Sequence, residues 1–273
     1  MGLSCSSCSD AGCGSPHPPE GGRWGNHADY VVALAGNPNT GKSTVFNALT
    51  GLKQRTGNWP GKTVMRAEGM VVHAGRRFKL VDLPGTYSLL STSQEEEIAR
   101  NFILFDEPHA TVVVVDATCL ERNLNLVLQI LEITDRAVVC LNLMDEAARK
   151  GIRVDEASLE RDLGIPVVPT VARSGTGLGR LMDVVSGLVA GEIATSPHRL
   201  ALDARLRRAV EELRPLIERM APCLPNIQWV ALRLLDGDER VTEALWSGEL
   251  ARQAGALSPA DRLPVAPVQE AFA

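Results

Sequence analysis

Short apolar runs alternate with helical stretches from residue 30 to about residue 190. Continuous runs rich in β-branched residues are typical of strands that are buried on both faces of a sheet. Such runs occupy residues 30–35, 70–72, 78–81, 111–115, 137–141 and 166–168. Helical patterns occupy residues 42–50, 94–105, 120–134, 155–163 and 178–190. The alternation predicts an α/β fold with a mostly parallel sheet flanked by helices, interrupted by one hairpin that turns near Ala74 and Gly75.

The two ends of the chain depart from this alternation. Residues 1–28 are dominated by Ser, Gly, Pro and Cys, which bury too little apolar surface to offset the entropy of the chain. After Gly191, apolar residues recur at helical spacing and predict a small all-helical domain. We therefore expect a flexible tail (1–28), an α/β domain (29–192), a helical domain (193–256) and a linker toward a missing domain (257–273).

Charge and hydropathy narrow the range of partners. The 273 residues include 28 Lys and Arg against 33 Asp and Glu, a formal net charge of -5. No broad basic surface that could neutralise a nucleic-acid backbone is therefore expected. No apolar run approaches the roughly 20 residues that cross a bilayer, and the N-terminus does not resemble an export signal. We expect a soluble chain that is not exported and does not bind nucleic acid.

Two polar clusters could bind a metal by composition alone. Cys5, Cys8, Cys13 and His17 crowd into the first residues, and Cys5 and Cys8 have the two-residue gap of metal or redox pairs. No second such pair follows, so a flexible tail is the simpler interpretation. The run Glu95-Glu96-Glu97 is either a metal patch or an acidic helix start that the helix dipole favours.

A glycine-rich turn lies between the first predicted strand and the first predicted helix. Gly36, Gly41, Lys42 and Ser43 match the P-loop pattern G-x-x-x-x-G-K-S in the strand–turn–helix context that it requires. In such a loop backbone N–H groups wrap phosphates, the lysine lies on the β and γ oxygens, and the serine ligates Mg²⁺. The predicted phosphate-binding residues are Gly36, Asn37, Pro38, Asn39, Thr40, Gly41, Lys42, Ser43 and Thr44. An ordinary strand-to-helix turn is the alternative.

The sequence Asp-Leu-Pro-Gly directly follows the predicted strand 78–81. At a strand end the Asp82 carboxylate can hold Mg²⁺ through water, and the Gly85 amide can sense a γ-phosphate. The nucleotide-contacting candidates here are Asp82, Leu83, Pro84 and Gly85. A lone Asp-x-x-Gly is common in turns, so its position downstream of the P-loop carries the prediction.

Two further loops are candidates for binding a nucleotide base. Asp145 can accept hydrogen bonds from guanine N1–H and the exocyclic amine, which adenine does not offer in the same places; the alternative is a helix N-cap. In the second loop, the N–H of Ala172 could bond guanine O6, although as a lone tetrapeptide it would be an ordinary loop. The candidates are Asn142, Leu143, Met144 and Asp145 in the first loop and Val171, Ala172 and Arg173 in the second.

A glycine-rich connection, residues 57–64, lies between the P-loop and Asp82. Loops of this kind close over Mg²⁺ and a γ-phosphate and loosen after hydrolysis. Thr63 is the candidate Mg²⁺ ligand in the closed loop, and Thr56 is the runner-up. The residues predicted to approach the nucleotide are Gly61, Lys62, Thr63 and Val64. A plain exposed loop is the alternative.

Taken together, these motifs resemble those of one family. Gly-Asn-Pro-Asn-x-Gly-Lys-Ser, Gln-Arg-x-Gly-Asn-Trp-Pro-Gly-x-Thr-Val, Asp-Leu-Pro-Gly-Thr-Tyr-Ser-Leu and Asn-x-Met-Asp look like the motifs of the FeoB family of bacterial ferrous iron transport proteins. The resemblance covers about residues 30–250. It implies a Ras-like P-loop GTPase domain and a helical domain that slows nucleotide release, followed in the same full-length protein by a membrane domain that moves Fe²⁺. It also implies a place at the cytoplasmic face of the bacterial inner membrane, with oligomeric state left open.

The resemblance also sets the expected chemistry. Thr86 stands where Ras-like enzymes place a water-orienting Gln, and because it is too short for that role we expect slow GTP hydrolysis. The candidate catalytic residues are Lys42, Thr63 and Gly85. Asn39 resembles the asparagine that holds K⁺ against the phosphates in potassium-activated relatives, so K⁺ is expected to stimulate turnover.

Two other functions are compatible with parts of this pattern. An RNA or ribosome-assembly GTPase of the Era type shares the phosphate and guanine motifs but usually appends a basic module, whereas the segment after Gly191 mixes Arg with Glu and Asp. A regulatory binding switch with negligible hydrolysis is the second alternative.

Overall fold

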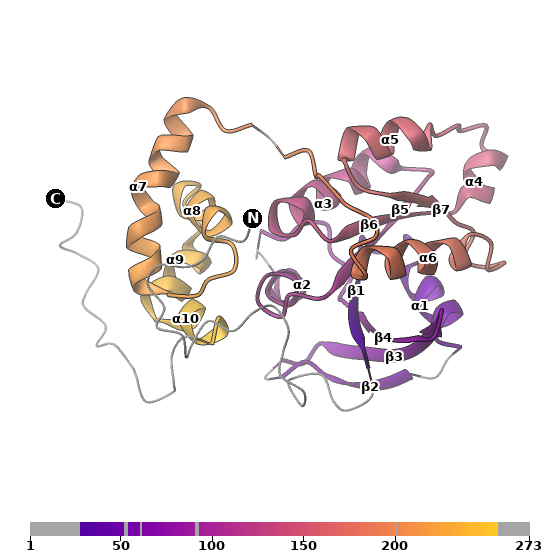
Figure 1. Cartoon of the computed structure of the whole chain (residues 1–273), viewed down its shortest axis with the longest axis horizontal. Helices are drawn as coiled ribbons and strands as arrows, with labels where there is room; N and C mark the ends of the chain where they lie inside the picture. Colours follow the sequence, from indigo (N-terminus) through magenta and orange to yellow (C-terminus); the bar gives the residue numbers. More distant parts are fainter. Residues whose placement is uncertain (1–27, 52–53, 61, 91–92, 200, 256–273) are drawn as a thin grey trace. The chain divides into compact units, whose positions relative to one another are not determined.

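The computed structural model describes residues 28–51, 54–60, 62–90, 93–199 and 201–255 (Figure 1). These residues form two compact units, one up to residue 199 and one from Ala201. The predictions for the tail and the linker, for Cys5, Cys8, Cys13 and His17, and for Gly61 lie outside the described residues.

The first unit is built on a seven-stranded sheet with the order β2-β3-β4-β1-β5-β6-β7. Its strands are β1 (Tyr30–Gly36), β2 (Gln54–Asn58), β3 (Met65–His73), β4 (Arg76–Asp82), β5 (Ala110–Asp116), β6 (Ala137–Asn142) and β7 (Val167–Pro169). Strands β4, β1, β5, β6 and β7 are parallel, while β2, β3 and β4 are antiparallel neighbours. The predicted mostly parallel sheet is confirmed, as is the hairpin, whose turn residues Ala74 and Gly75 have positive φ.

Six helices of the described residues cover this sheet. They are α1 (Lys42–Thr50), α2 (Gln94–Phe105), α3 (Leu120–Ile133), α4 (Met144–Arg149), α5 (Glu156–Leu163) and α6 (Leu178–Val189). Ser93 is the N-cap residue of α2, and its hydroxyl accepts the Glu96 N–H at 3.2 Å. The acidic run Glu95–Glu97 therefore fills the first turn of a capped helix, where the dipole favours carboxylates.

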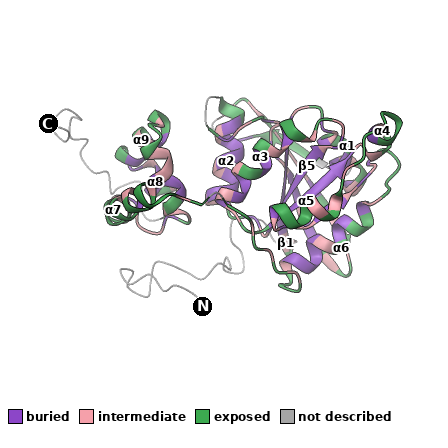
Figure 2. Cartoon of the chain, turned by 90° about the horizontal axis from the view of Figure 1, so that it is seen from above, coloured by how far each residue is buried: buried purple, intermediate pink, exposed green. Residues whose placement is uncertain are grey.

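The core explains why the valine-rich runs became strands. Alternate residues of β1, β4, β5 and β6 join one buried cluster with Val45 and Phe46 of α1 and Leu181 and Val185 of α6. The residues between them point to the opposite face, where α3 packs on β5 and β6. Figure 2 shows the resulting pattern, with buried strands inside and exposed helix surfaces outside.

Three features of the first unit differ from the sequence prediction. We expected residues 54–58 to be partly loop. In the structure they form strand β2, because their backbone pairs with β3. The six-residue helix α4 was not predicted. Residues 193–199, expected in the helical domain, belong to the first unit, because the Thr195 hydroxyl donates to Asp135 O at 2.6 Å and Arg199 Nε donates to Leu131 O at 2.7 Å.

The second unit consists of helices α7 (Ala204–Met220), α8 (Ile227–Leu235), α9 (Glu239–Trp246) and α10 (Glu249–Gln253). Their contacts bury Val210 and Ile217 of α7 against the apolar faces of α8 and α9. The apolar pattern of residues 241–250 is divided between two helices, since Gly248 adopts a left-handed conformation. Within the described residues, none of the helices combines the length and apolar composition that crossing a bilayer requires.

Candidate nucleotide-binding site

The predicted site loops all leave the sheet at the same edge. β1, β4, β6 and β7 are parallel, and their carboxyl ends lead into the P-loop, Asp82, Asn142 and Val171 respectively. β1 lies between β4 and β5, so the chain crosses to both sides of it. Ligands of open α/β sheets bind at this kind of switch point.

The P-loop has the backbone of an anion-binding turn. Asn39 and Gly41 have φ values of 68° and 82°, and Thr40 closes the turn by donating to Asn37 O at 2.9 Å. A β-carbon on Gly36 would lie 2.6 Å from Val114 O, so a side chain there would not fit. The side chain of Asn37 is only 3% exposed, and neither its nitrogen nor its oxygen has a partner among the described residues. The loop thus contains a buried side-chain amide that no described residue satisfies.

Lys42 joins the P-loop to the Asp82 loop. Its ammonium forms an ion pair with Asp82 and donates to Leu83 O at 2.6 Å. Burial raises the pKa of Asp82, and the neighbouring Lys42 charge opposes that rise. The fold therefore brings together a cation and a carboxylate that are 40 residues apart, while Ser43 and Thr44 stay exposed at the start of α1.

Gly85 and Thr86 lie directly beside the P-loop. A β-carbon on Gly85 would be 3.5 Å from the Pro38 backbone, and Thr86 N donates to Gly36 O at 3.3 Å. The Thr86 hydroxyl donates to Ser88 O at 2.6 Å and accepts the Ser88 N–H at 3.2 Å. This hydroxyl is therefore engaged in a local turn.

Asn142 links the P-loop to the second base-binding candidate. Its Nδ2 donates to Thr40 O at 3.0 Å, and its Oδ1 accepts from Ala172 N at 3.0 Å. We expected the Ala172 N–H to be available for guanine O6, but in the structure it donates to the Asn142 side chain. Thr170, which the sequence did not single out, is buried and reaches both Asn142 Oδ1 and Leu141 O at 3.4 Å. No pattern in a single sequence identifies such a side-chain link.

The remaining base-binding candidates are accessible. Leu143, with φ 62°, is the N-cap residue of α4, and it is half-buried like Met144. Asp145 is exposed in the first helical turn, so the alternative of a capping role for Asp145 is wrong. Its carboxylate forms an ion pair with Arg149 at 3.7 Å. Arg173 is exposed in the following loop.

The connection before β3 packs on α2. Trp59 is buried, its ring stands edge-on to Phe102 at 5.5 Å, and the Arg66 guanidinium lies 4.6 Å above it. Lys62, expected near the nucleotide, pairs with Glu97 of α2 at 3.1 Å. Thr63 and Val64 follow, with Thr63 exposed, and Thr56 lies within β2.

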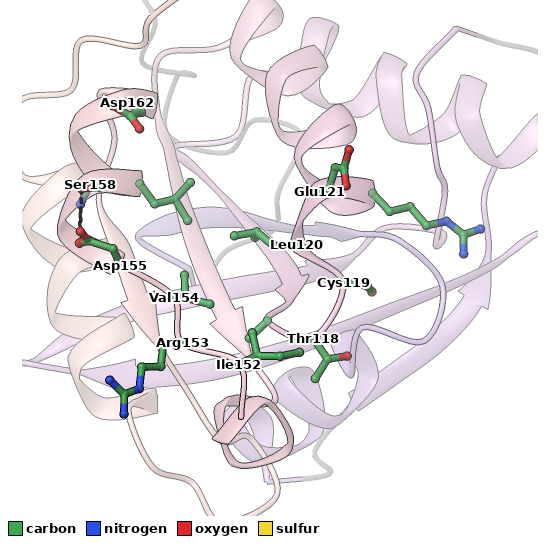
Figure 3. A pocket seen from close by; sticks show the side chains of 13 residues that line it. Thr118, Cys119, Leu120, Glu121, Ile152, Arg153, Val154, Asp155, Ser158 and Asp162 are labelled. Atoms are coloured by element: carbon green, nitrogen blue, oxygen red, sulfur yellow. Dashed lines mark hydrogen bonds between the residues drawn. The ribbon is translucent and has the colours of Figure 1, made fainter. Parts of the chain in front are cut away.

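A cavity of about 610 Å³ lies between the start of α3 and the segment that leads into α5 (Figure 3). Its wall includes Leu120, Ile152 and Val154, with Asp155 bonded to Ser158 at the start of α5. None of the predicted site residues lines it. Because it lacks a phosphate-binding loop, we do not assign the nucleotide to it.

Comparisons with known proteins match most of the chain to one family. The family model of ferrous iron transport protein B matches residues 30–185. The Fe(2+) transporter FeoB of Salmonella typhimurium is 39% identical over 228 residues, which cover 81% of this chain and 28% of the relative. The chain thus spans less than a third of that relative.

Solved structures give the same match. The cytosolic domain of the T. maritima FeoB iron transporter in apo form has a TM-score of 0.72 and 35% identity, covering 79% of this chain and 84% of that one. An S. thermophilus NFeoB E67A mutant bound to GDP has a TM-score of 0.71 and 32% identity, covering 83% and 87%.

Proposed function

The chain belongs to the ferrous iron transport protein B (FeoB) family, and we propose that it binds GTP and hydrolyses it slowly, as the switch portion of an Fe²⁺ membrane transporter. The observation that carries the proposal is the Asn142 side chain, which ties the P-loop at Thr40 to the loop of Ala172. This link holds a phosphate-binding loop and a base-binding loop at one edge of the sheet. The Era-type alternative is not favoured, because the family match is to iron transporters.

We propose that the P-loop receives the phosphates of GTP. Asn39 and Gly41 are left-handed, as residues of anion-binding turns often are, and the backbone N–H groups of the loop would bind the phosphate oxygens. Lys42 would exchange its bond to Leu83 O for the β and γ oxygens, remaining close to Asp82. Gly85, next to Pro38, would contact the γ-phosphate through its amide.

Residues of the chain suit the two cations that the family implies. Ser43 and Asp82, with Thr63 from the connecting loop, are oxygen ligands of the kind that Mg²⁺ takes, and Asn39 would hold K⁺. When bound, these cations supply positive charge next to the γ-phosphate. The exposed hydroxyls of Ser43 and Thr63 are free to turn toward a ligand.

We propose that Asp145 recognises guanine. Its exposed carboxylate, 3.7 Å from Arg149, would accept from N1–H and the exocyclic amine, while half-buried Leu143 would pack on the purine. The loop of Val171 and Arg173 would border the base, without the Ala172 N–H that already bonds Asn142.

Slow hydrolysis follows from Thr86. This residue stands in place of a water-orienting glutamine, and its hydroxyl is bonded to Ser88. The attacking water would then depend on backbone groups of the connection at residues 57–64.

The substitution Asn39→Ala is expected to remove the preference for K⁺. Wild-type phosphate release should be roughly tenfold faster in KCl than in NaCl, because a cation at the phosphates stabilises charge in the transition state. The variant should release phosphate equally in both salts while its rate in NaCl stays at the wild-type level. A variant that kept the wild-type ratio of rates would contradict this role for Asn39.

The proposed function is tested by titrating the purified chain with fluorescent GDP and ADP and by following phosphate release from GTP in KCl and MgCl₂. We expect guanine-selective binding and slow release. Tight binding with no release would favour a pure binding switch, and equal affinity for adenine would contradict guanine recognition. For the transport role, Fe²⁺ uptake by cells carrying the full-length transporter should depend on Lys42.

A further inference from the structure

Helix α3 holds the segment that follows Gly85. The Gln129 Oε1 atom accepts two hydrogen bonds from this segment, one from the Leu89 N–H at 2.7 Å and one from the Ser88 hydroxyl at 3.2 Å. Gln129 itself is half-buried, and Leu89 is buried. A single acceptor atom therefore fixes two consecutive residues.

A second contact lies on the same face of α3. The Arg122 guanidinium lies 4.2 Å from the centre of the Tyr87 ring. Arg122 and Gln129 are seven residues apart, or about two helical turns, so they share one face of the helix. Tyr87, Ser88 and Leu89 are thus each held by α3.

The other end of the segment is held by the P-loop strand. Thr86 N donates to Gly36 O at 3.3 Å, and Leu83 N donates to Leu34 O at 2.9 Å. Gly85 consequently lies on a short span between the P-loop and Gln129. Helix α3 is itself anchored in the core, because its residues Leu126, Val127 and Ile130 are fully buried.

We propose that Gln129 is a positioning residue for GTP hydrolysis, which keeps the Gly85 amide in register with the γ-phosphate without touching the nucleotide. This inference rests on the proposed GTPase function. Displacing a contact group by about 1 Å can cost roughly 100-fold in rate, whereas binding of the base and the first two phosphates does not involve this segment. Gln129 therefore affects the rate of hydrolysis and not the affinity for GDP.

The test compares Gln129→Leu with wild type under K⁺ and Mg²⁺. The leucine removes the acceptor for both hydrogen bonds, and kcat for GTP should fall roughly tenfold. The dissociation constant of fluorescent GDP should change by less than about twofold. Gln129→Glu keeps an acceptor oxygen in place and should restore most of kcat. Asn125→Leu, an exposed polar residue on the same helix, is the matched control and should leave kcat unchanged.

A second variant provides an independent test if Gln129→Leu does not fold. Arg122→Met releases only the exposed Tyr87 ring and should lower kcat roughly twofold to fivefold without changing the affinity for GDP. Thermal melting of all variants shows whether they fold.

Three results would overturn the inference: unchanged kcat in Gln129→Leu, an equal loss of kcat and GDP affinity, or failure of Gln129→Glu to restore the rate. If wild type binds GDP but releases no phosphate, both the proposed GTPase function and the positioning role of Gln129 fail. If wild type hydrolyses GTP and Gln129→Leu does so equally fast, only the positioning role fails.

Discussion

Replacing Asp145 with asparagine is expected to weaken GDP binding at least about 100-fold, because the two charge-assisted hydrogen bonds that we propose between Asp145 and guanine would be lost. The carboxylate is exposed, and its partner Arg149, 3.7 Å away, also pairs with Glu146, so the substitution should not disturb α4. Competition of unlabelled GDP against a fluorescent guanine nucleotide measures the effect.

Nucleotides with a different base distinguish a loss of guanine recognition from a general loss of nucleotide binding. Xanthine carries a carbonyl where guanine carries the exocyclic amine, so the amide of Asp145→Asn can donate to it. We expect this variant to bind xanthosine diphosphate more tightly than wild type does. Glu146→Gln is the matched control, since Glu146 pairs with Arg149 on the same helix. A uniform loss of affinity for every base would contradict the assignment of Asp145.

Gly41→Ala is expected to abolish nucleotide binding and to destabilise the fold. A β-carbon at Gly41 would lie 2.4 Å from Asn142 Nδ2, at a backbone φ of 82° that residues with side chains rarely adopt. The Asn142 amide would have to move, which breaks its bond to Thr40 O. We expect a loss of roughly 2–4 kcal/mol in the free energy of unfolding and at least about 100-fold in GDP affinity.

Gly179→Ala provides the control for this change. Gly179 lies on α6, and a β-carbon there meets no atom within 4 Å. Because Gly179 lies in the first turn of the helix, alanine there should gain at most about 0.5 kcal/mol. Urea unfolding and GDP titration of both variants give the comparison. Equal behaviour of the two variants would show that the Asn142 link does not constrain the P-loop.

Much of the fold could be predicted because its determinants are local. The valine-rich runs of β5 and β6 and the glycine-flanked helix α1 are visible as patterns of neighbouring residues. β2 could not be predicted, since Gln-Arg-Thr-Gly-Asn has no apolar alternation and becomes a strand only by pairing with β3. The split between α9 and α10 depends on the conformation of Gly248, which the apolar pattern alone does not reveal.

The candidate site also combines features that local patterns predict with contacts that only the tertiary structure reveals. Parallel strands have their carboxyl ends at one edge of the sheet. The pattern of strands was therefore enough to predict that the loops of Lys42 and Asp82, which form an ion pair, lie at the same edge. The partners of Lys62 and of the Ala172 N–H were not predictable, because Glu97 and Asn142 lie 35 and 30 residues away.

The amino-acid sequence by itself determined the α/β class, the P-loop and the family, because each depends on residue types at short, regular spacing. Only the tertiary structure decided which groups hold the loops in place: Asn142 between Thr40 and Ala172, and Gln129 against Ser88 and Leu89. The physical reason is that a hydrogen bond requires two atoms to come within about 3 Å. Packing of distant elements, which no local pattern encodes, sets that distance.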